Sequence, residues 1–145
     1  MKKDSARNLI LLMLWLTLMI WLVARTPPRT ETEGRLKTMV ADLDFMFRNG
    51  SVLSKHENAK TGAALALYNL DALTWGGQKA VMLKGSLATK GWTAVDENSH
   101  IFVMCKNGMK ASISRDADKI SVNGLEKAAY SVSMEFNAGT KDFCG

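Results

Sequence analysis

The chain has 145 residues and a formal net charge of +5 at pH 7. This length allows one domain with a modest core once any membrane-spanning segment is set aside. The lysines of the second half are scattered singly and are not clustered with aromatic side chains, which argues against a nucleic-acid-binding groove.

An uninterrupted apolar run over residues 9–24 dominates the N-terminal part. It has no charge and no polar stripe, as expected of a helix that faces lipid on every side. The run covers about 24 Å of a hydrocarbon layer roughly 30 Å thick, so flanking cations must snorkel. We therefore expect a cytoplasmic stub over residues 1–8 and a transmembrane helix over residues 9–25. The expected anchoring side chains are Leu9, Leu12, Leu14, Trp15, Leu16, Leu18, Ile20, Trp21 and Leu22.

A cleaved secretory signal is the main alternative for this run. Such signals have a shorter apolar region and small residues at positions −3 and −1 of the cut. The candidate cut after Ala24 has Leu22 at position −3, which favours a permanent anchor. A buried core helix is the remaining alternative.

Two adjacent prolines predict a break over residues 26–29 that ends the first helix. A second helix is expected over residues 30–47, because Thr30 and Glu33 have the spacing of a capping box and Asn49-Gly50 is a typical stop. Its apolar face could pack on the domain's own sheet or contact partner helices. That face consists of Leu36, Met39, Val40, Leu43, Met46 and Phe47.

The middle of the chain predicts a loop and a second short helix. Residues 51–62 are polar and carry no period, whereas residues 63–73 have helical spacing. Trp75-Gly76-Gly77 then redirects the chain. Beyond residue 79, short apolar runs between turn residues predict an antiparallel sheet of four or five strands. The candidate strands are 80–83, 92–95, 100–105, 109–114, 120–122 and 130–136, with a hairpin at Asn107-Gly108.

Together these elements predict an α+β domain over residues 30–145 that follows the anchor. The two cysteines, Cys105 and Cys144, would close a loop of about 40 residues in an oxidising compartment and contribute roughly 4 kcal/mol. This pair favours export of the domain, although two reduced, buried thiols are the alternative. Basic residues are too evenly divided between the two sides of the anchor to decide its orientation.

No pattern in the sequence brings catalytic groups together. His56 and His100 are the two histidines, and a triad of Ser99, His100 and Asp96 would place its members on alternating faces of a strand. The histidines and cysteines also lack the paired spacing of a zinc site. We therefore expect no enzymatic activity, no metal, no cofactor, and neither a nucleic acid nor a small-molecule substrate as partner.

This arrangement resembles type IV pilins, pseudopilins and the small bitopic proteins of bacterial pilus and secretion systems. It also looks like the small PilM-type inner-membrane accessory proteins of type IVb pili. The matching parts are residues 9–24, 30–47 and 51–91, the strands between 92 and 136, and the cysteine pair. The resemblance implies a pilin-like fold and a role in pilus assembly, conjugation or secretion.

Two departures from the pilin pattern favour an accessory protein over a filament subunit. A pilin has a small residue at its processing site and an early glutamate in the apolar run, and this run has neither. Pro27-Pro28 also breaks the helix that pilins keep nearly continuous. We expect a single-pass protein of the bacterial inner membrane with its C-terminal domain in the periplasm, in contact with the lipid bilayer and other assembly proteins. A minor pilin of the filament and an extracytoplasmic sensor or enzyme domain are the alternatives.

Overall fold

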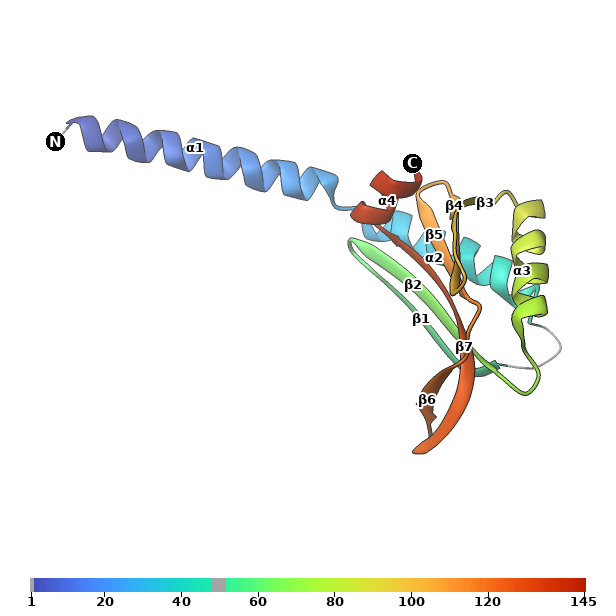
Figure 1. Ribbon diagram of the computed structural model, residues 1–145. Coiled ribbons are helices and arrows are strands. Elements are labelled where there is room, and N and C mark those ends of the chain that lie inside the picture. Colours follow the sequence, from blue (N-terminus) through green and yellow to red (C-terminus); the bar gives the residue numbers. More distant parts are fainter. Residues whose placement is uncertain (1, 48–51) are drawn as a thin grey trace.

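The computed structural model describes residues 2–47 and 52–145, and it has two parts. A long N-terminal helix projects from an α+β head, in which helices cover one face of a curved antiparallel sheet (Figure 1). The helices are α1 (Lys2–Arg25), α2 (Arg29–Asp44), α3 (Gly77–Thr89) and α4 (Ala138–Cys144). The strands are β1 (Val52–Lys60), β2 (Ala63–Asp71), β3 (Thr93–Glu97), β4 (Ile101–Lys106), β5 (Met109–Ser114), β6 (Asp118–Val122) and β7 (Leu125–Asn137).

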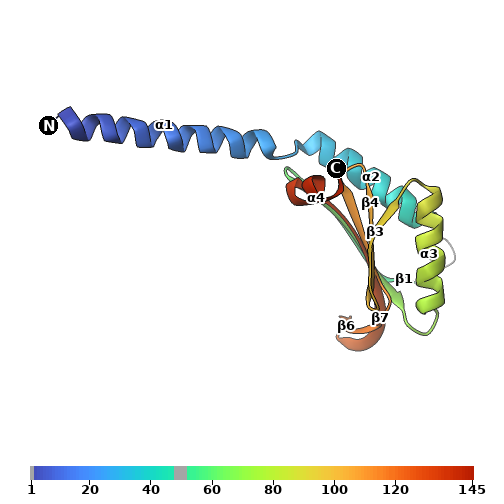
Figure 2. The ribbon, with the colours of Figure 1, turned by 45° about the horizontal axis from the view of Figure 1, so that its top comes forward.

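The sheet is organised around its longest strand, β7. The strand order is β1-β2-β7-β5-β4-β3, and β6 pairs with the first residues of β7 beyond the end of β5. Both α2 and α3 lie on one face of this sheet, whereas the short α4 lies at the end nearest α1 (Figures 1 and 2). The opposite face is left without a covering helix over most of its area.

The core lies between the sheet and the helices α2 and α3. Alternate residues of each central strand turn inward, and α2 and α3 contribute residues spaced three, four or seven apart. The fully buried side chains include Met39, Leu43, Tyr68, Leu70, Leu83, Leu87, Trp92, Phe102, Met134 and Phe136.

Three predicted elements of the middle segment are wrong. Residues 52–60 form strand β1 where a loop was predicted, and residues 63–71 form strand β2 where a helix was predicted. Every second residue of β2 is buried, but the other face carries Leu65 and Leu67, so the strand is apolar on both sides and its alternation is hidden. The strand predicted over residues 80–83 lies in α3, whose Ala80, Leu83 and Leu87 pack on the sheet.

Several other expectations are confirmed. The first helix ends at Arg25, and strands occur close to five of the candidate segments, with β7 longer than predicted. Asn107 and Gly108 have φ values of 50° and 77°, as a tight hairpin requires. The described residues form seven strands, however, so the prediction of four or five is too low.

The two ends of the second helix and the C-terminal tail differ from the predictions. Helix α2 begins at Arg29, after Pro28 and without a side-chain cap, so the capping box predicted at Thr30 and Glu33 is wrong. Helix α2 ends at Asp44, before the predicted end at residue 47, and the predicted stop at Asn49-Gly50 lies outside the described residues. The polar tail forms helix α4, which Asn137 and Thr140 begin with a reciprocal capping box.

The apolar face predicted for residues 30–47 packs on the head's own sheet, with Met46 and Phe47 just beyond the end of α2. Met39, Leu43 and Phe47 are buried in the core, and the remaining members are partly buried against it. Of the two alternatives that the sequence left open for this face, packing on the domain's own sheet is the one that the structure shows. The face consists of Leu36, Met39, Val40, Leu43, Met46 and Phe47.

Candidate functional site

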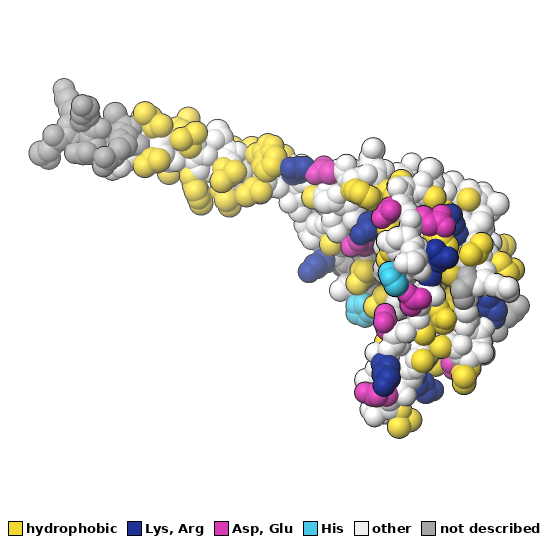
Figure 3. Space-filling view, in the orientation of Figure 1, with side chains coloured by type: hydrophobic (Ala, Val, Ile, Leu, Met, Phe, Trp, Pro, Cys, Tyr) yellow, Lys and Arg dark blue, Asp and Glu magenta, His cyan; other side chains and the backbone are white. Residues whose placement is uncertain are grey.

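The most conspicuous surface of the protein is the bare apolar helix α1. Its large apolar side chains from Leu9 to Val23 are 41–70% exposed, and no part of the head covers them (Figure 3). A soluble protein rarely leaves such a continuous apolar surface uncovered. Among the described residues, α1 provides the helix long and apolar enough to cross a membrane. All nine predicted anchor residues lie on it.

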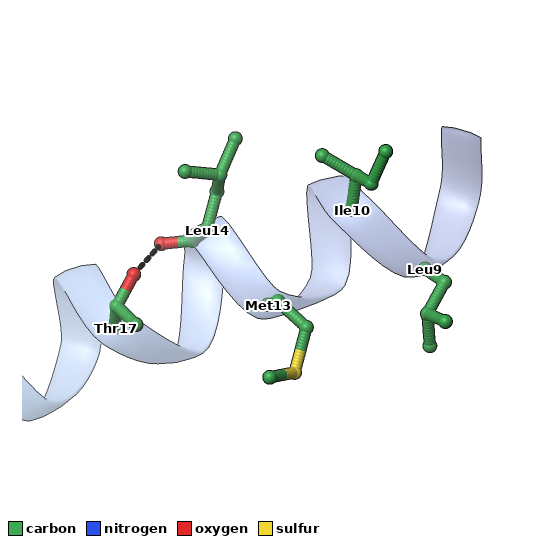
Figure 4. A pocket seen from close by; sticks show the side chains of 5 residues that line it. All are labelled: Leu9, Ile10, Met13, Leu14 and Thr17. Atoms are coloured by element: carbon green, nitrogen blue, oxygen red, sulfur yellow. Dashed lines mark hydrogen bonds between the residues drawn. The ribbon is translucent and has the colours of Figure 1, made fainter. Parts of the chain in front are cut away.

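The polar atoms of this helix are satisfied within it. The Thr17 hydroxyl donates a hydrogen bond to the Leu14 carbonyl oxygen at 2.9 Å (Figure 4). A shallow hollow of 310 Å³ lies beside this hydroxyl. Only side chains of α1 itself line it, and no second element closes it. This hollow is therefore a groove on the helix surface, and the hydroxyl can lie in lipid without losing a hydrogen bond.

The connection between α1 and the head is fixed by hydrogen bonds. The Pro27 carbonyl accepts a bond of 2.9 Å from the Gly62 N–H in the β1–β2 turn. Gly62 has a φ of +90°, and a Cβ there would lie 3.2 Å from Cγ2 of Thr26. The buried Thr32 hydroxyl lies 3.0 Å from the Lys60 carbonyl oxygen and so ties α2 to the same turn. We call these residues, Thr26, Pro27, Thr32, Lys60 and Gly62, the junction.

The C-terminal helix α4 adds a second connection at the same place. Arg25, the last residue of α1, forms an ion pair with Asp142, and its guanidinium also lies 4.9 Å from the centroid of the Trp21 ring. The predicted disulfide between Cys105 and Cys144 is present and ties α4 to β4, with Cα atoms 5.2 Å apart. The head is thus held to the end of α1 through both its first and its last elements.

The uncovered face of the sheet is rich in hydroxyl groups. Residues that lie opposite each other in adjacent strands share this face, which we call the open face. The open face includes Leu65, Leu67, Asn69, Ile101, Val103, Lys110, Ser112, Ser114, Ser131, Ser133 and Glu135. A hollow of 530 Å³ at its edge is lined by four of these serines together with His100, Asp116 and Asp118.

Within this hollow His100 and Asp116 form a pair that the sequence analysis did not predict. Nδ1 of His100 lies 2.5 Å from Oδ2 of Asp116, and Ser114 Oγ donates to the Asp116 carbonyl oxygen. Both partners are exposed, with side chains 79% and 60% accessible. Such a pair in open water has no dry pocket in which to activate a hydroxyl. The two residues are 16 apart and lie at the open end of the β4–β5 hairpin, where Ile101 pairs with Ser114 and the Arg115 N–H donates to the His100 carbonyl oxygen. The Asn107-Gly108 turn is therefore the sequence signal that could have placed them side by side.

The described residues, 2–47 and 52–145, contain no group of three or more His, Cys, Asp or Glu side chains placed to hold a metal ion. His56 lies on β1 opposite Leu67, and both cysteines are consumed by the disulfide. The zinc set weighed from the sequence is therefore not assembled.

Comparisons of the chain with known protein families, with curated proteins and with solved structures found no match.

Proposed function

We propose that the protein is a non-enzymatic, single-pass component of a bacterial type IV pilus or of a related secretion or conjugation assembly. Helix α1 holds it in the inner membrane, and the head lies in the periplasm and acts through contacts with other assembly proteins. The observation that carries this proposal is the bare apolar surface of α1, which a lipid bilayer or other membrane helices would cover.

The junction supports a role in holding the head at a fixed position above the bilayer. The bonds of Pro27 to Gly62, Thr32 to Lys60 and Arg25 to Asp142 leave little freedom between anchor and head. The disulfide fits a head exposed to an oxidising compartment.

Replacement of Leu14 and Leu18 by Lys tests the anchor. Each lysine at the bilayer centre costs roughly 3 kcal/mol on insertion scales, so the double variant should fail to insert. We expect translation in the presence of inner-membrane vesicles to leave the wild type in the carbonate-resistant pellet and the variant in the supernatant. The matched control places lysines at Leu73 and Leu125, which are 93% and 65% exposed in the head, and should remain in the pellet. An L14K/L18K variant that resists carbonate extraction would contradict the anchor.

The assembly role is tested in the cells that make the protein. A strain without the chain should lose surface pili or the secretion that depends on them, and the wild type but not L14K/L18K should restore them. Unchanged pili in the deletion strain would contradict the proposal. Recovery of the chain in sheared filaments, with a mature N-terminus near Asn8, would instead identify it as a minor pilin.

A further inference from the structure

We propose that the outer side of helix α3 is a docking surface for an amphipathic helix of another protein, whose apolar stripe is bordered by acidic side chains. The proposal names a kind of partner for the assembly role proposed above, and in that respect it rests on that role. The surface itself belongs to the head.

The side of α3 that faces away from the sheet is apolar and bare. Ala80, Leu83 and Leu87 are buried against the sheet, whereas Val81 and Met82 are 53% and 68% exposed. A surface helix normally carries polar and charged side chains on its outward side. On α3 that side is exposed and uncharged for more than two turns. We call it the outer stripe, and it consists of Val81, Met82, Gly85, Ala88 and Thr89.

Gly85 lies in the middle of the outer stripe, and the packing of the head gives no reason for a glycine there. A Cβ at this position would meet no atom of the surrounding structure within 4 Å. Glycine in a helix interior is destabilising relative to alanine. What the missing side chain provides is room for a second helix, because the distance between packed helices depends on the side chains at their contact. Ala88, close to one turn further along, is also small.

Lysines border one edge of the outer stripe and determine the charge that a partner should carry. Lys79 and Lys90 are eleven residues apart, about three turns, and so lie on the same edge, beside Met82. The Lys79 amine donates to a backbone carbonyl oxygen rather than to a carboxylate. Lys90 lies 3.5 Å from Asp42, but Lys106 lies 2.8 Å from the same carboxylate. This edge therefore has an excess of positive charge, which acidic side chains of a partner would complement.

Two other occupants fit this surface less well. A second copy would bring lysines against lysines, because α3 and its C-terminal cap carry Lys79, Lys84 and Lys90 and no acidic residue. The bilayer around α1 would lie at the opposite end of the head, since α3 lies at the end farthest from α1 (Figures 1 and 2). Lys84 is paired with Glu97, so the second edge of the stripe is neutral. The acidic side chains of the partner should therefore line one edge of its apolar stripe.

Photocrosslinking in the cells that make the protein tests this surface. Benzoylphenylalanine replaces Met82 in one strain and Leu125 in another, because Leu125 is 65% exposed but lies at the start of β7, beside β6. We expect a discrete protein adduct at position 82, in several-fold excess over position 125. Mass spectrometry of this adduct should locate the crosslink in a segment of helical periodicity, with acidic residues beside its apolar positions.

Two variants separate docking from folding. Lys79→Glu should reduce the adduct yield several-fold, whereas the matched change Lys119→Glu, at an exposed position of β6, should leave it unchanged. Gly85→Leu should also reduce the yield, because the larger side chain holds the partner helix away. The melting temperature of the purified chain should stay the same or rise in Gly85→Leu. A yield that falls only together with the melting temperature would show a structural role and overturn the docking surface.

The outcomes also separate this surface from the assembly role. An adduct with a second copy, with lipid or with a segment that lacks acidic side chains would overturn the docking surface, as would a yield at position 82 no higher than at 125. If the strain without the chain loses its pili and position 82 gives no such excess, docking fails and the proposed function stands. If pili persist in that strain and position 82 crosslinks to an acidic helix, the surface stands and the pilus role fails.

Discussion

The carboxylate of Asp42 is the main buried charge of the head. It accepts hydrogen bonds from Trp92 Nε1 at 2.9 Å and from Lys106 Nζ at 2.8 Å, and Lys90 lies 3.5 Å away. Burial alone would raise the pKa of Asp42, but these bonds and the two lysine charges outweigh it and hold the pKa below its ordinary value. The helical pattern of α2 marks Asp42 only as a polar position, because its partners are 50 and 64 residues away.

Replacement of Asp42 by Asn should lower the free energy of unfolding by about 2 kcal/mol at pH 7, because the partly buried Lys106 and the buried Trp92 indole lose a charged acceptor. The folded-state pKa lies below the ordinary 3.8, so the wild-type advantage is complete above that value and is lost as the pH falls through the folded pKa. Urea unfolding of the full chain in detergent from pH 7 to pH 2 measures this difference. The control Asp116→Asn alters an exposed pair and should change stability by under about 0.5 kcal/mol. An equal loss for Asp42→Asn at both ends of the pH range would contradict this account.

Among the helices and strands, the sequence predicted correctly those that depend on residues close together in the chain. The β4–β5 and β6–β7 hairpins follow from Asn-Gly turns, whose two residues have positive φ in both cases. Strand β2 could not be found this way, since its alanines and leucines favour a helix and its strand state depends on pairing with β1 and β7. The register of β7 with β2 joins residues more than 50 apart.

Alanine replacement of two leucines in β2 can show whether this segment is a strand or a helix in solution. Leu70 is fully buried on the face of the sheet that α2 covers, whereas Leu67 is partly buried on the open face. Leu70→Ala should therefore lower the free energy of unfolding by about 3 kcal/mol, and Leu67→Ala by about 1 kcal/mol. In a helix these residues, three apart, would share one face and lose similar amounts. Chemical denaturation of both variants decides the matter, and equal losses would count against the strand.

For the whole molecule, the long apolar helix was predictable and the way it joins the head was not. Composition alone identifies residues 9–24, because an apolar surface on every side of a helix has few other uses. The junction and α4 depend on contacts between distant residues, such as Pro27 with Gly62 and Arg25 with Asp142, 117 residues apart. No local pattern encodes such a contact.

The basic residues that flank the apolar run are too evenly divided to decide by themselves how the molecule would lie across a membrane. Lys2, Lys3 and Arg7 precede the anchor, and Arg25, Arg29, Arg35 and Lys37 follow it. If the head lies in the periplasm, the three cations of the N-terminal flank must keep that end in the cytoplasm. Alkaline phosphatase, which needs an oxidising compartment, reports this orientation when fused after Gly145.

We expect the wild-type fusion to be active and replacement of Lys2, Lys3 and Arg7 by Gln to reduce its activity strongly. The basic residues then remain on one side only, and the positive-inside rule favours the inverted orientation, in which the head stays in the reducing cytoplasm. The Cys105–Cys144 disulfide should be lost in parallel, as alkylation of both thiols would show. The matched control removes three cations from the head, far from the anchor, and should keep full activity: Lys79, Lys119 and Lys127 replaced by Gln. An inactive wild-type fusion with both thiols reduced would place the head in the cytoplasm and overturn the proposed orientation.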